Sequence, residues 1–217
     1  MNRTNYTIDA RNKVKRVPER GHYDQETVYA ILDAGFLCHT SFSIEGQPFI
    51  IPTLYGREGN TLYIHGANTS RMIQHLDKGV DMALAVTHVD GMVLARSAFH
   101  HSMNYRSVIV FGTAKRVRDE EKEHALFILA EQLLKGRWEE ARKPNAKELK
   151  ATTVLAVEIE QASAKIRTGG PKDEQADYDL DIWAGVVPLH LGSLPPVADE
   201  LLKAGVEIPA SVLALKK

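Results

Sequence analysis

The sequence predicts an α+β fold in which about six or more short antiparallel strands close into a small barrel, with helices at its periphery. Short runs rich in β-branched and aromatic residues follow one another along the chain. Turns containing Gly and Asn separate these runs, and only a few helical segments interrupt them. At 217 residues with 44% hydrophobic content, residues 1–217 fit a single domain with one substantial core.

The two ends of the chain differ in character from its middle. Residues 1–22 lack apolar periodicity, so we expect an extended arm that wraps the body or is partly mobile. Asp24 is a suitable N-cap for a short helix over residues 25–34, which Gly35 would end. Residues 168–217 begin with glycines and an acidic run, and we expect a loop and a short helix packed on the barrel.

The first half of the predicted sheet is an antiparallel meander. The turn sequences Glu45-Gly46-Gln47-Pro48 and Arg57-Glu58-Gly59-Asn60 lie between β-rich runs, as hairpins require. Apolar residues at helical spacing then predict a helix over residues 71–78, closed by Gly79. The strands expected in this half are residues 36–44, 48–55 and 61–65.

The second half of the predicted sheet surrounds a longer helix. Residues 120–134 place apolar side chains on one face, which is typical of an amphipathic helix, and residues 145–150 predict a further helical stretch. The strands expected here are residues 81–87, 91–97, 107–116, 152–159 and 162–167, and a final short helix is expected near residues 198–204.

Composition excludes several classes of protein. The formal net charge is −1 with both signs interspersed, so the chain has no broad electrostatic surface for nucleic acid or an anionic membrane. A single cysteine, Cys38, excludes an internal disulfide framework, favours a reducing compartment and is read as a small buried hydrophobe. Because no signal-peptide or membrane-spanning run occurs, we expect a cytoplasmic protein.

The first candidate site follows the strand that ends at His65. Residues 66–71 lead from this strand into a helix, where backbone N–H groups, the Ser70 hydroxyl and the Arg71 guanidinium could hold a phosphate. A purely structural alternative makes Ser70 a helix cap and Arg71 a solvated residue. His65 could likewise donate to a ligand or serve as a structural hydrogen-bonding group.

Two further clusters contain residue types that bind flat or charged ligands. Residues 97–107 form a polar, aromatic and basic connection between predicted strands, which is typical of a binding loop. Its adjacent His100 and His101 point in different directions and lack further ligands at suitable spacing, so we expect no metal site. Trp183 could fill a core or stack on a planar ligand.

Taken in order, the short motifs of this chain resemble the flavin-nucleotide-binding family related to pyridoxamine-phosphate oxidase, which includes nitroimidazole-resistance reductases. The resemblance runs from about Arg16 to about Pro188, and its order of motifs is specific. The motifs that carry it are residues 16–23, Gln47-Pro48, Ile51-Pro52-Thr53, residues 62–66, Val89-Asp90-Gly91, residues 95–102, residues 104–108, Gly136-Arg137-Trp138, Ser163-Ala164-Lys165 and residues 183–188.

This resemblance implies an FMN-binding split β-barrel that forms a homodimer with flavin sites at the subunit interface. If the protein is a flavoenzyme, we expect His65 and Tyr55 to be the candidates for proton donation or substrate contact. The cofactor-binding residues that it implies are Pro52, Thr53, Leu54 and Tyr55 along the ring edge, His65 and Gly66 beside the ring, Ser70 and Arg71 at the phosphate, Asn104, Tyr105, Arg106 and Ser107 from the partner subunit, and Trp183 over the ring.

The sequence departs from the true pyridoxamine-phosphate oxidases at the flavin strand. Ile51 and Gly56 stand near positions where that group carries Arg and Lys, and its C-terminal Arg-x-His motif is absent. We therefore expect a different small-molecule oxidoreductase, with a nicotinamide compound as a candidate electron donor. The alternatives are a non-catalytic protein that binds or senses flavin or haem, with His65, His100 and His101 as candidate iron ligands, and a barrel without a ligand.

Overall fold

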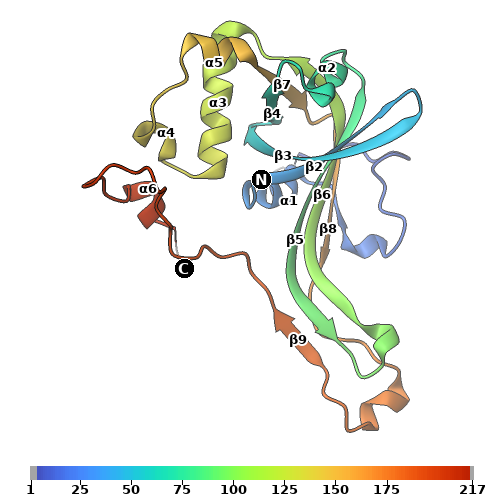
Figure 1. The fold of residues 1–217 in the computed structure, drawn as a ribbon. Coiled ribbons are helices and arrows are strands. Elements are labelled where there is room, and N and C mark those ends of the chain that lie inside the picture. The colour runs from blue at the N-terminus through green and yellow to red at the C-terminus, as the bar shows by residue number, and fades with distance from the viewer. Residues whose placement is uncertain (1–3, 216–217) are drawn as a thin grey trace.

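The computed structural model describes residues 4–215, and its strands form one antiparallel nine-stranded sheet (Figure 1). Six strands pair in a closed ring, because β5 pairs with β6 in addition to the linear order of the sheet. In ring order these are β6 (Ser102–Arg116), β7 (Thr152–Glu158), β4 (Thr61–Ala67), β3 (Gln47–Glu58), β2 (Leu37–Ile44) and β5 (Asp81–Leu94). The α+β split-barrel prediction is confirmed.

The barrel is split because β6 changes neighbours along its length. Residues 114–116 pair with β7 inside the ring, whereas residues 105–111 pair with β8 (Gln161–Arg167) outside it. The strand β1 (Gly21–His22) adds to the free edge of β8. At the far end of the long β5–β6 ribbon, β9 (Gly185–Pro188) pairs with residues 91–94 (Figure 1).

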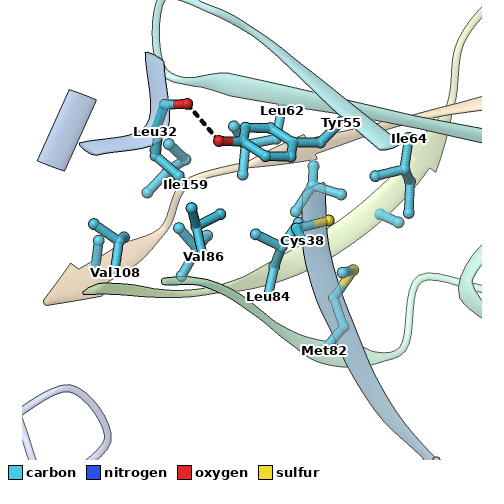
Figure 2. Close-up of a cluster of buried hydrophobic side chains, with 14 of the residues drawn as sticks. Leu32, Cys38, Tyr55, Leu62, Ile64, Met82, Leu84, Val86, Val108 and Ile159 are labelled. Carbon is cyan, nitrogen blue, oxygen red and sulfur yellow. Dashed lines mark hydrogen bonds between the residues drawn. The ribbon is translucent and has the colours of Figure 1, made fainter. Parts of the chain in front are cut away.

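The ring encloses the main hydrophobic core, as expected from the alternation of apolar residues along each strand (Figure 2). Cys38 lies in this core with no exposed surface, which agrees with its interpretation as a small buried hydrophobe. Tyr55 is also fully buried, and its hydroxyl donates a hydrogen bond to the Leu32 carbonyl oxygen. A second, smaller cluster lies between the outer face of the sheet and α3 (Asp119–Leu133).

Most predicted helices are present with small changes at their ends. In α1 (Gln25–Asp33), Asp24 caps the helix by accepting a hydrogen bond from the Thr27 N–H at 3.0 Å. In α5 (Ala146–Ala151), Asn145 and Glu148 form a capping box. The remaining helices are α2 (Arg71–Leu76), α4 (Arg137–Glu140), α6 (Ala210–Leu213) and the 3-10 turns at Pro18–Arg20, Ala98–His100 and Gln175–Asp179.

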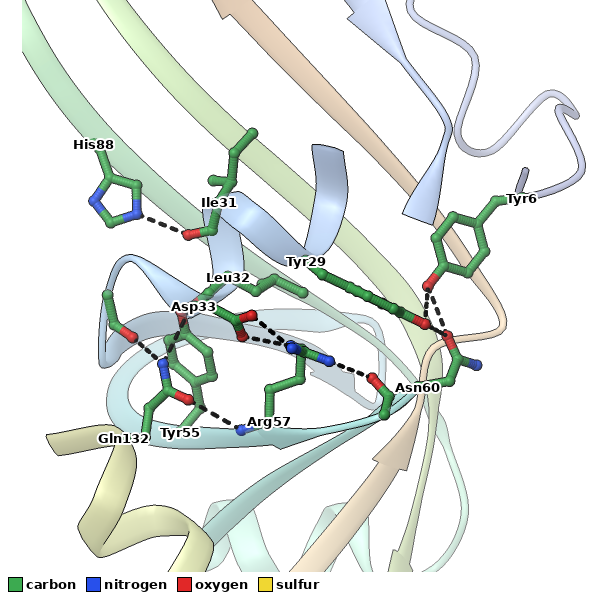
Figure 3. A network of polar contacts seen from close by, with 12 residues as sticks. Tyr6, Tyr29, Ile31, Leu32, Asp33, Tyr55, Arg57, Asn60, His88 and Gln132 are labelled. Carbon is green, nitrogen blue, oxygen red and sulfur yellow. Dashed lines mark hydrogen bonds and ion pairs between the residues drawn. The ribbon is translucent and has the colours of Figure 1, made fainter. Parts of the chain in front are cut away.

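From residue 4 onward the N-terminal arm is folded against the barrel. Tyr6 is 7% exposed, its N–H donates to the Tyr23 carbonyl at 2.9 Å, and its hydroxyl donates to the Asn60 Oδ1 at 2.6 Å (Figure 3). The arm is therefore anchored to the barrel at Tyr6. Residues 1–3 of the expected arm, like residues 216–217 of the expected tail, lie outside the described chain.

Two sequence predictions about secondary structure are wrong. Residues 81–87 and 91–97 are not separate strands, because β5 continues through a bulge between Val89 and Gly91. Residues 198–204 do not form a helix, and the last helix lies later, at α6. Leu201 is 91% exposed, and without a packed apolar face so short a helix has little to stabilise it.

Among the described residues, no helix is long and apolar enough to cross a membrane.

Candidate functional site

The strands β3 and β4 form the floor of the predicted cofactor site. They are antiparallel, with Tyr55 opposite Ile64, so Pro52 to Leu54 and His65 lie at the same end of the strand pair. Gly66 follows, and a Cβ built on it would lie 2.9 Å from the Ile73 Cγ1. A glycine is therefore required at this position for α2 to fold back against the end of β4. This fold-back places Ser70 and Arg71, at the start of α2, beside the end of β4.

Ser70 and Arg71 have side-chain donors free for a ligand. Ser70 stands at the N-cap of α2, but its side chain makes no capping hydrogen bond. The exposed Arg71 guanidinium stacks on the Phe49 ring, with its central carbon 4.3 Å from the ring centroid, and forms no ion pair within residues 4–215. Ser70 thus occupies the N-cap position without a capping bond from its side chain, and an uncommitted hydroxyl and guanidinium fit a phosphate.

His65 is partly buried in β4, and its Nδ1 has no hydrogen-bond partner in the described part of the chain. Burial lowers the pKa of this imidazole below its usual value of 6.5, so the ring is neutral near pH 7. A buried polar atom without a partner is costly unless something outside the chain satisfies it. His65 therefore fits a group that contacts a cofactor through a neutral nitrogen.

The expected role of the Tyr55 side chain in proton donation does not fit the structure. The Tyr55 hydroxyl is committed to the Leu32 carbonyl oxygen, which also accepts from the Gln132 Nε2 at 3.2 Å (Figure 3). Burial raises the pKa of the Tyr55 phenol well above its ordinary value of 10.0. The side chain belongs to the core that joins α1 to β3, and only the backbone of Tyr55 remains available along the strand.

The second cluster is a connection only over residues 97–101, which hold the 3-10 turn at Ala98–His100, whereas residues 102–107 belong to a strand and correct the interpretation of residues 97–107 as one loop. Asn104, Tyr105, Arg106 and Ser107 all lie in β6. The polar side chains of three of them already have partners within the chain. Arg106 forms a bidentate ion pair with Asp90 at 2.8 and 2.9 Å. Asn104 donates to the Gly169 carbonyl at 3.1 Å, and Ser107 donates to the Lys165 carbonyl at 3.4 Å.

Within one chain, the two clusters lie apart. Across the sheet, Pro52 of β3 pairs with His39, His39 pairs with Ala85, and Ala85 pairs with Ile109 of β6. Three steps between neighbouring strands span roughly 14 Å, so residues 104–107 cannot touch a ring held against residues 52–54. The residues assigned to one flavin site by the sequence therefore form two separate surfaces on the protomer.

Trp183 lies just before β9 and is 66% exposed, so it is not core filler. A Cβ built on Gly185 would lie 2.9 Å from the Trp183 Cζ2, and the missing side chain lets the indole fold over the backbone. The histidines of the nearby turn have local partners. His101 Nδ1 accepts a hydrogen bond from the Ala95 N–H at 3.0 Å, and His100 lies 3.8 Å from the Glu174 carboxylate.

Sequence reasoning missed the apolar residues on the outside of the barrel beside Pro52. Leu37 is 51% exposed and Ile50 is 68% exposed, although both stand in strands of the ring. Single exposed apolar residues are common, but these two lie on the same face of the β2–β3 pair, on either side of the His39–Pro52 pair. Residues 36–38 are apolar without alternation, and this pattern could have indicated a strand with two covered faces.

Comparison with known proteins agrees with this architecture. The family model of pyridoxamine 5′-phosphate oxidase matches residues 24–166, which is most of the chain. The chain belongs to the pyridoxamine 5′-phosphate oxidase family. This confirms the family that the sequence motifs resemble. A comparison of this chain with curated proteins finds no match.

Two solved structures resemble this family member over nearly its whole length. The flavocytochrome Anf3 from Azotobacter vinelandii is 39% identical with a TM-score of 0.89, over 96% of this chain and 97% of that one. The FAD and haem binding protein from Mycobacterium smegmatis is 35% identical with a TM-score of 0.87, over 90% of this chain and 97% of that one.

A third structure shares the fold alone. It is a protein assigned to 5-nitroimidazole antibiotic resistance in Bacteroides thetaiotaomicron, 22% identical with a TM-score of 0.57, over 67% of this chain and 86% of that one.

Proposed function

We propose that this protein is a flavin-binding redox protein that transfers electrons to a small molecule. The observation that carries the proposal is the similarity to a flavocytochrome over 96% of the chain with a TM-score of 0.89. The free donors of Ser70 and Arg71 beside β3 and β4 support it independently. A bound flavin supplies the hydride and electron transfer, and the protein binds and orients it.

The flavin expected from the sequence is FMN, whereas the mycobacterial neighbour favours FAD. Both contain the same ring and the same first phosphate, so one set of residues serves either cofactor. In this proposal the backbone of Pro52, Thr53 and Leu54 lies along the ring edge. Ser70 and Arg71 hold the phosphate through charge-assisted hydrogen bonds.

A homodimer completes the site in this proposal. Asn104, Tyr105, Arg106 and Ser107 would come from the partner subunit, because they lie too far from β3 to act within one protomer, and Trp183 would cover the ring. The Asp90 ion pair holds the Arg106 guanidinium in one orientation, and the exposed indole of Trp183 is free to cover a ring.

Haem is a second candidate ligand, favoured by the flavocytochrome and by the mycobacterial FAD and haem binding protein. Among the candidate iron ligands, His65 fits best, because its Nδ1 is buried without a partner and its lowered pKa keeps the imidazole neutral. A neutral imidazole is the form that ligates iron. His101 fits less well, since its Nδ1 already accepts the Ala95 N–H.

Oxidation of pyridoxamine phosphate is not proposed for this protein. Ile51 packs against the core, and Gly56 lies directly beneath α3, where even a Cβ would be 2.9 Å from the Ile128 carbonyl group. A lysine therefore cannot be accommodated at Gly56 with α3 in place. The charges that would hold a second phosphate at these positions are absent.

The test is an absorbance spectrum of the purified protein, repeated after addition of FMN, FAD or haemin and desalting. We expect flavin bands that persist, with chromatography of the released flavin distinguishing FAD from FMN, and a Soret band after haemin addition. Retained flavin that NADH reduces and a small acceptor reoxidises would support the redox role. A protein that retains neither flavin contradicts the proposal.

Two substitutions test whether Arg71 binds the flavin and whether His65 ligates the haem iron. Arg71→Ala removes a charge-assisted contact of about 2 kcal/mol, so flavin should bind about 30-fold more weakly. Lys78→Ala, which removes an exposed charge just beyond α2, is the matched control and should bind normally. His65→Ala should lose the Soret band, and equal haem uptake by this variant would exclude His65 as the iron ligand.

A further inference from the structure

A basic pocket lies on the other side of the molecule from β3, at the end of β8 and beside β1. Its volume is about 450 Å³, and its charged and titratable lining includes Arg20, His22, Arg167, Lys172 and Glu19. It is separate from Ser70 and Arg71 and from residues 52–54, since β8 joins the sheet through the edge of β6 that faces away from β5, and it adjoins Asn104 and Tyr105 of β6, because Arg167 donates to Asn104 Oδ1 and pairs with Tyr105. The proposed flavin site uses none of these five side chains.

Arg167 is the buried centre of this pocket. It is 8% exposed, and its guanidinium donates to Asn104 Oδ1 and to the carbonyl oxygens of Gly169 and Gly170, the latter two at 3.4 Å. All these acceptors are neutral. A buried guanidinium keeps its charge, and burial without an anionic partner is costly.

The surroundings of Arg167 increase this cost. Burial lowers the pKa of the Arg167 guanidinium, and the positive charge of Arg20 lowers it further. Within residues 4–215, neither Arg20, Arg167 nor Lys172 takes part in an ion pair, and the exposed Glu19 does not contact them as a counterion. The fold thus holds three cations around one pocket without neutralising them.

The loop after β8 keeps the pocket open. Gly169 has a φ of +93°, which favours glycine, and it turns the chain so that the loop carbonyls reach Arg167. A Cβ on Gly170 would meet no atom within 4 Å, so the space beside the loop is free. Lys172 then stands at the rim with its ammonium group available.

We propose that this pocket binds a phosphate-bearing anion, at a site separate from the flavin phosphate site of Ser70 and Arg71. A phosphate carries up to two negative charges and several acceptor oxygens, so it matches three cations better than a single carboxylate does. The phosphate group belongs either to the free inorganic anion or to a nucleotide.

The experiment is a backbone amide NMR titration of the full chain with inorganic phosphate and, separately, with AMP, at constant ionic strength set by chloride. We expect saturable shifts of the amides of residues 20–22 and 166–172. Binding of AMP at least tenfold tighter than phosphate assigns the site to a nucleotide, and equal affinity assigns it to the free anion. Absence of saturable shifts with both probes overturns the proposal.

Variants at the rim locate the binding. Arg20→Ala and Lys172→Ala should each weaken the tighter probe at least tenfold, whereas Lys203→Ala in the exposed tail should leave its affinity unchanged. Phosphate should also raise the melting temperature of the wild-type protein and not that of the Arg20→Ala, Lys172→Ala double variant. Unchanged affinity in both single variants contradicts the assignment. Flavin content of these variants, measured separately, distinguishes this site from the proposed flavin site.

Discussion

At the level of single residues, burial determines which titratable side chains of the barrel can reach a ligand. Cys38 and Tyr55 have no exposed surface and find their hydrogen-bond partners inside the chain. His65 is partly buried, yet one of its nitrogens has no partner within the described range. Side chains on neighbouring strands therefore have different chemistry, because the desolvation of each one differs.

Cys38 should be unreactive while the protein is folded. Burial raises the pKa of its thiol to about 12, so the nucleophilic thiolate is scarce at pH 8, and no reagent has access to the sulfur. A chromogenic disulfide reagent should modify less than a tenth of the thiol in native protein within about an hour, and one equivalent in guanidinium chloride. Rapid labelling of the native protein would show that β2 opens readily.

His65 should make the unliganded protein less stable as the pH falls. The folded state lowers the pKa of His65, whereas the unfolded chain keeps the ordinary value of 6.5. Below that pH the unfolded chain takes up a proton that the folded chain resists, so the free energy of unfolding decreases, by at most about 1.4 kcal/mol per pH unit. The decrease begins near 6.5 and ends at the lower folded pKa.

Urea unfolding of the apoprotein at about pH 5.5 and about pH 7.5 measures this effect. His65→Gln should lose part of the pH dependence, while His190→Gln in the exposed tail should retain all of it. An identical slope in wild type and His65→Gln would mean that the imidazole ionises normally in the folded state.

At the level of elements, the contact of α3 with the barrel depends on one small residue. A Cβ on Gly56 would lie 2.9 Å from backbone atoms of Ile128 and Leu129. Backbone atoms of a helix cannot rotate aside as a side chain can. The helix α3 therefore lies closer to β3 than any other residue type would permit.

Gly56→Ala should destabilise the protein by about 1–3 kcal/mol, because α3 must shift away from the sheet. The matched control is Gly170→Ala, where an added Cβ meets no atom within 4 Å and the effect should be small. Thermal or urea unfolding measures both. If Gly56→Ala is as stable as the control, α3 is not held as tightly as the structure indicates.

The sequence predicts elements better than it predicts their pairing. Alternation and capping locate α1, α3 and most of the ring strands, because these signals lie within a few residues of one another. The bulge in β5 could not be predicted from the sequence, because Val89-Asp90-Gly91 has the composition of a turn. In the structure the pairing of β5 with β6 continues on both sides of these residues. Residues 198–204 have helical composition but no surface to pack on, which local sequence does not reveal.

The positions of the candidate site residues along the chain follow from the sequence for the same reason, and their packing does not. The relation of His65, Gly66, Ser70 and Arg71 is local, so the motif locates them between the end of β4 and the start of α2, and their role at a cofactor stays a prediction. The burial of Tyr55 depends on Leu32 in a helix and on strands far away in sequence. Its side chain could therefore be assigned to the core only from the folded structure.

At the level of the whole molecule, the outside of the barrel beside the candidate site is apolar and open. Leu37 and Ile50 are exposed there, and Val89 on β5 is 44% exposed. The proposed dimer would cover such a surface and would bring residues 104–107 of one chain to residues 52–54 of the other. Assembly and cofactor binding would then depend on each other.

Light scattering should give a mass of twice 24.1 kDa for the wild-type protein. Ile50→Lys places a charge in the proposed interface, so it should yield monomers and reduce flavin binding at least tenfold. Leu133→Lys, at a similarly exposed apolar residue on α3, should remain dimeric. A wild-type monomer that binds a full equivalent of flavin would exclude the shared site.

The ring closure has a consequence for the order in which the protein can fold during synthesis. Its last strand, β7, ends at Glu158, and β4 cannot pair with this strand until residues 68–151, which lie between the two strands, have been synthesised. No part of the ring comes from residues 168–215. The barrel can therefore close while these residues are still being synthesised. A chain arrested before residue 152 would instead leave the edges of β4 and β6 open to aggregation.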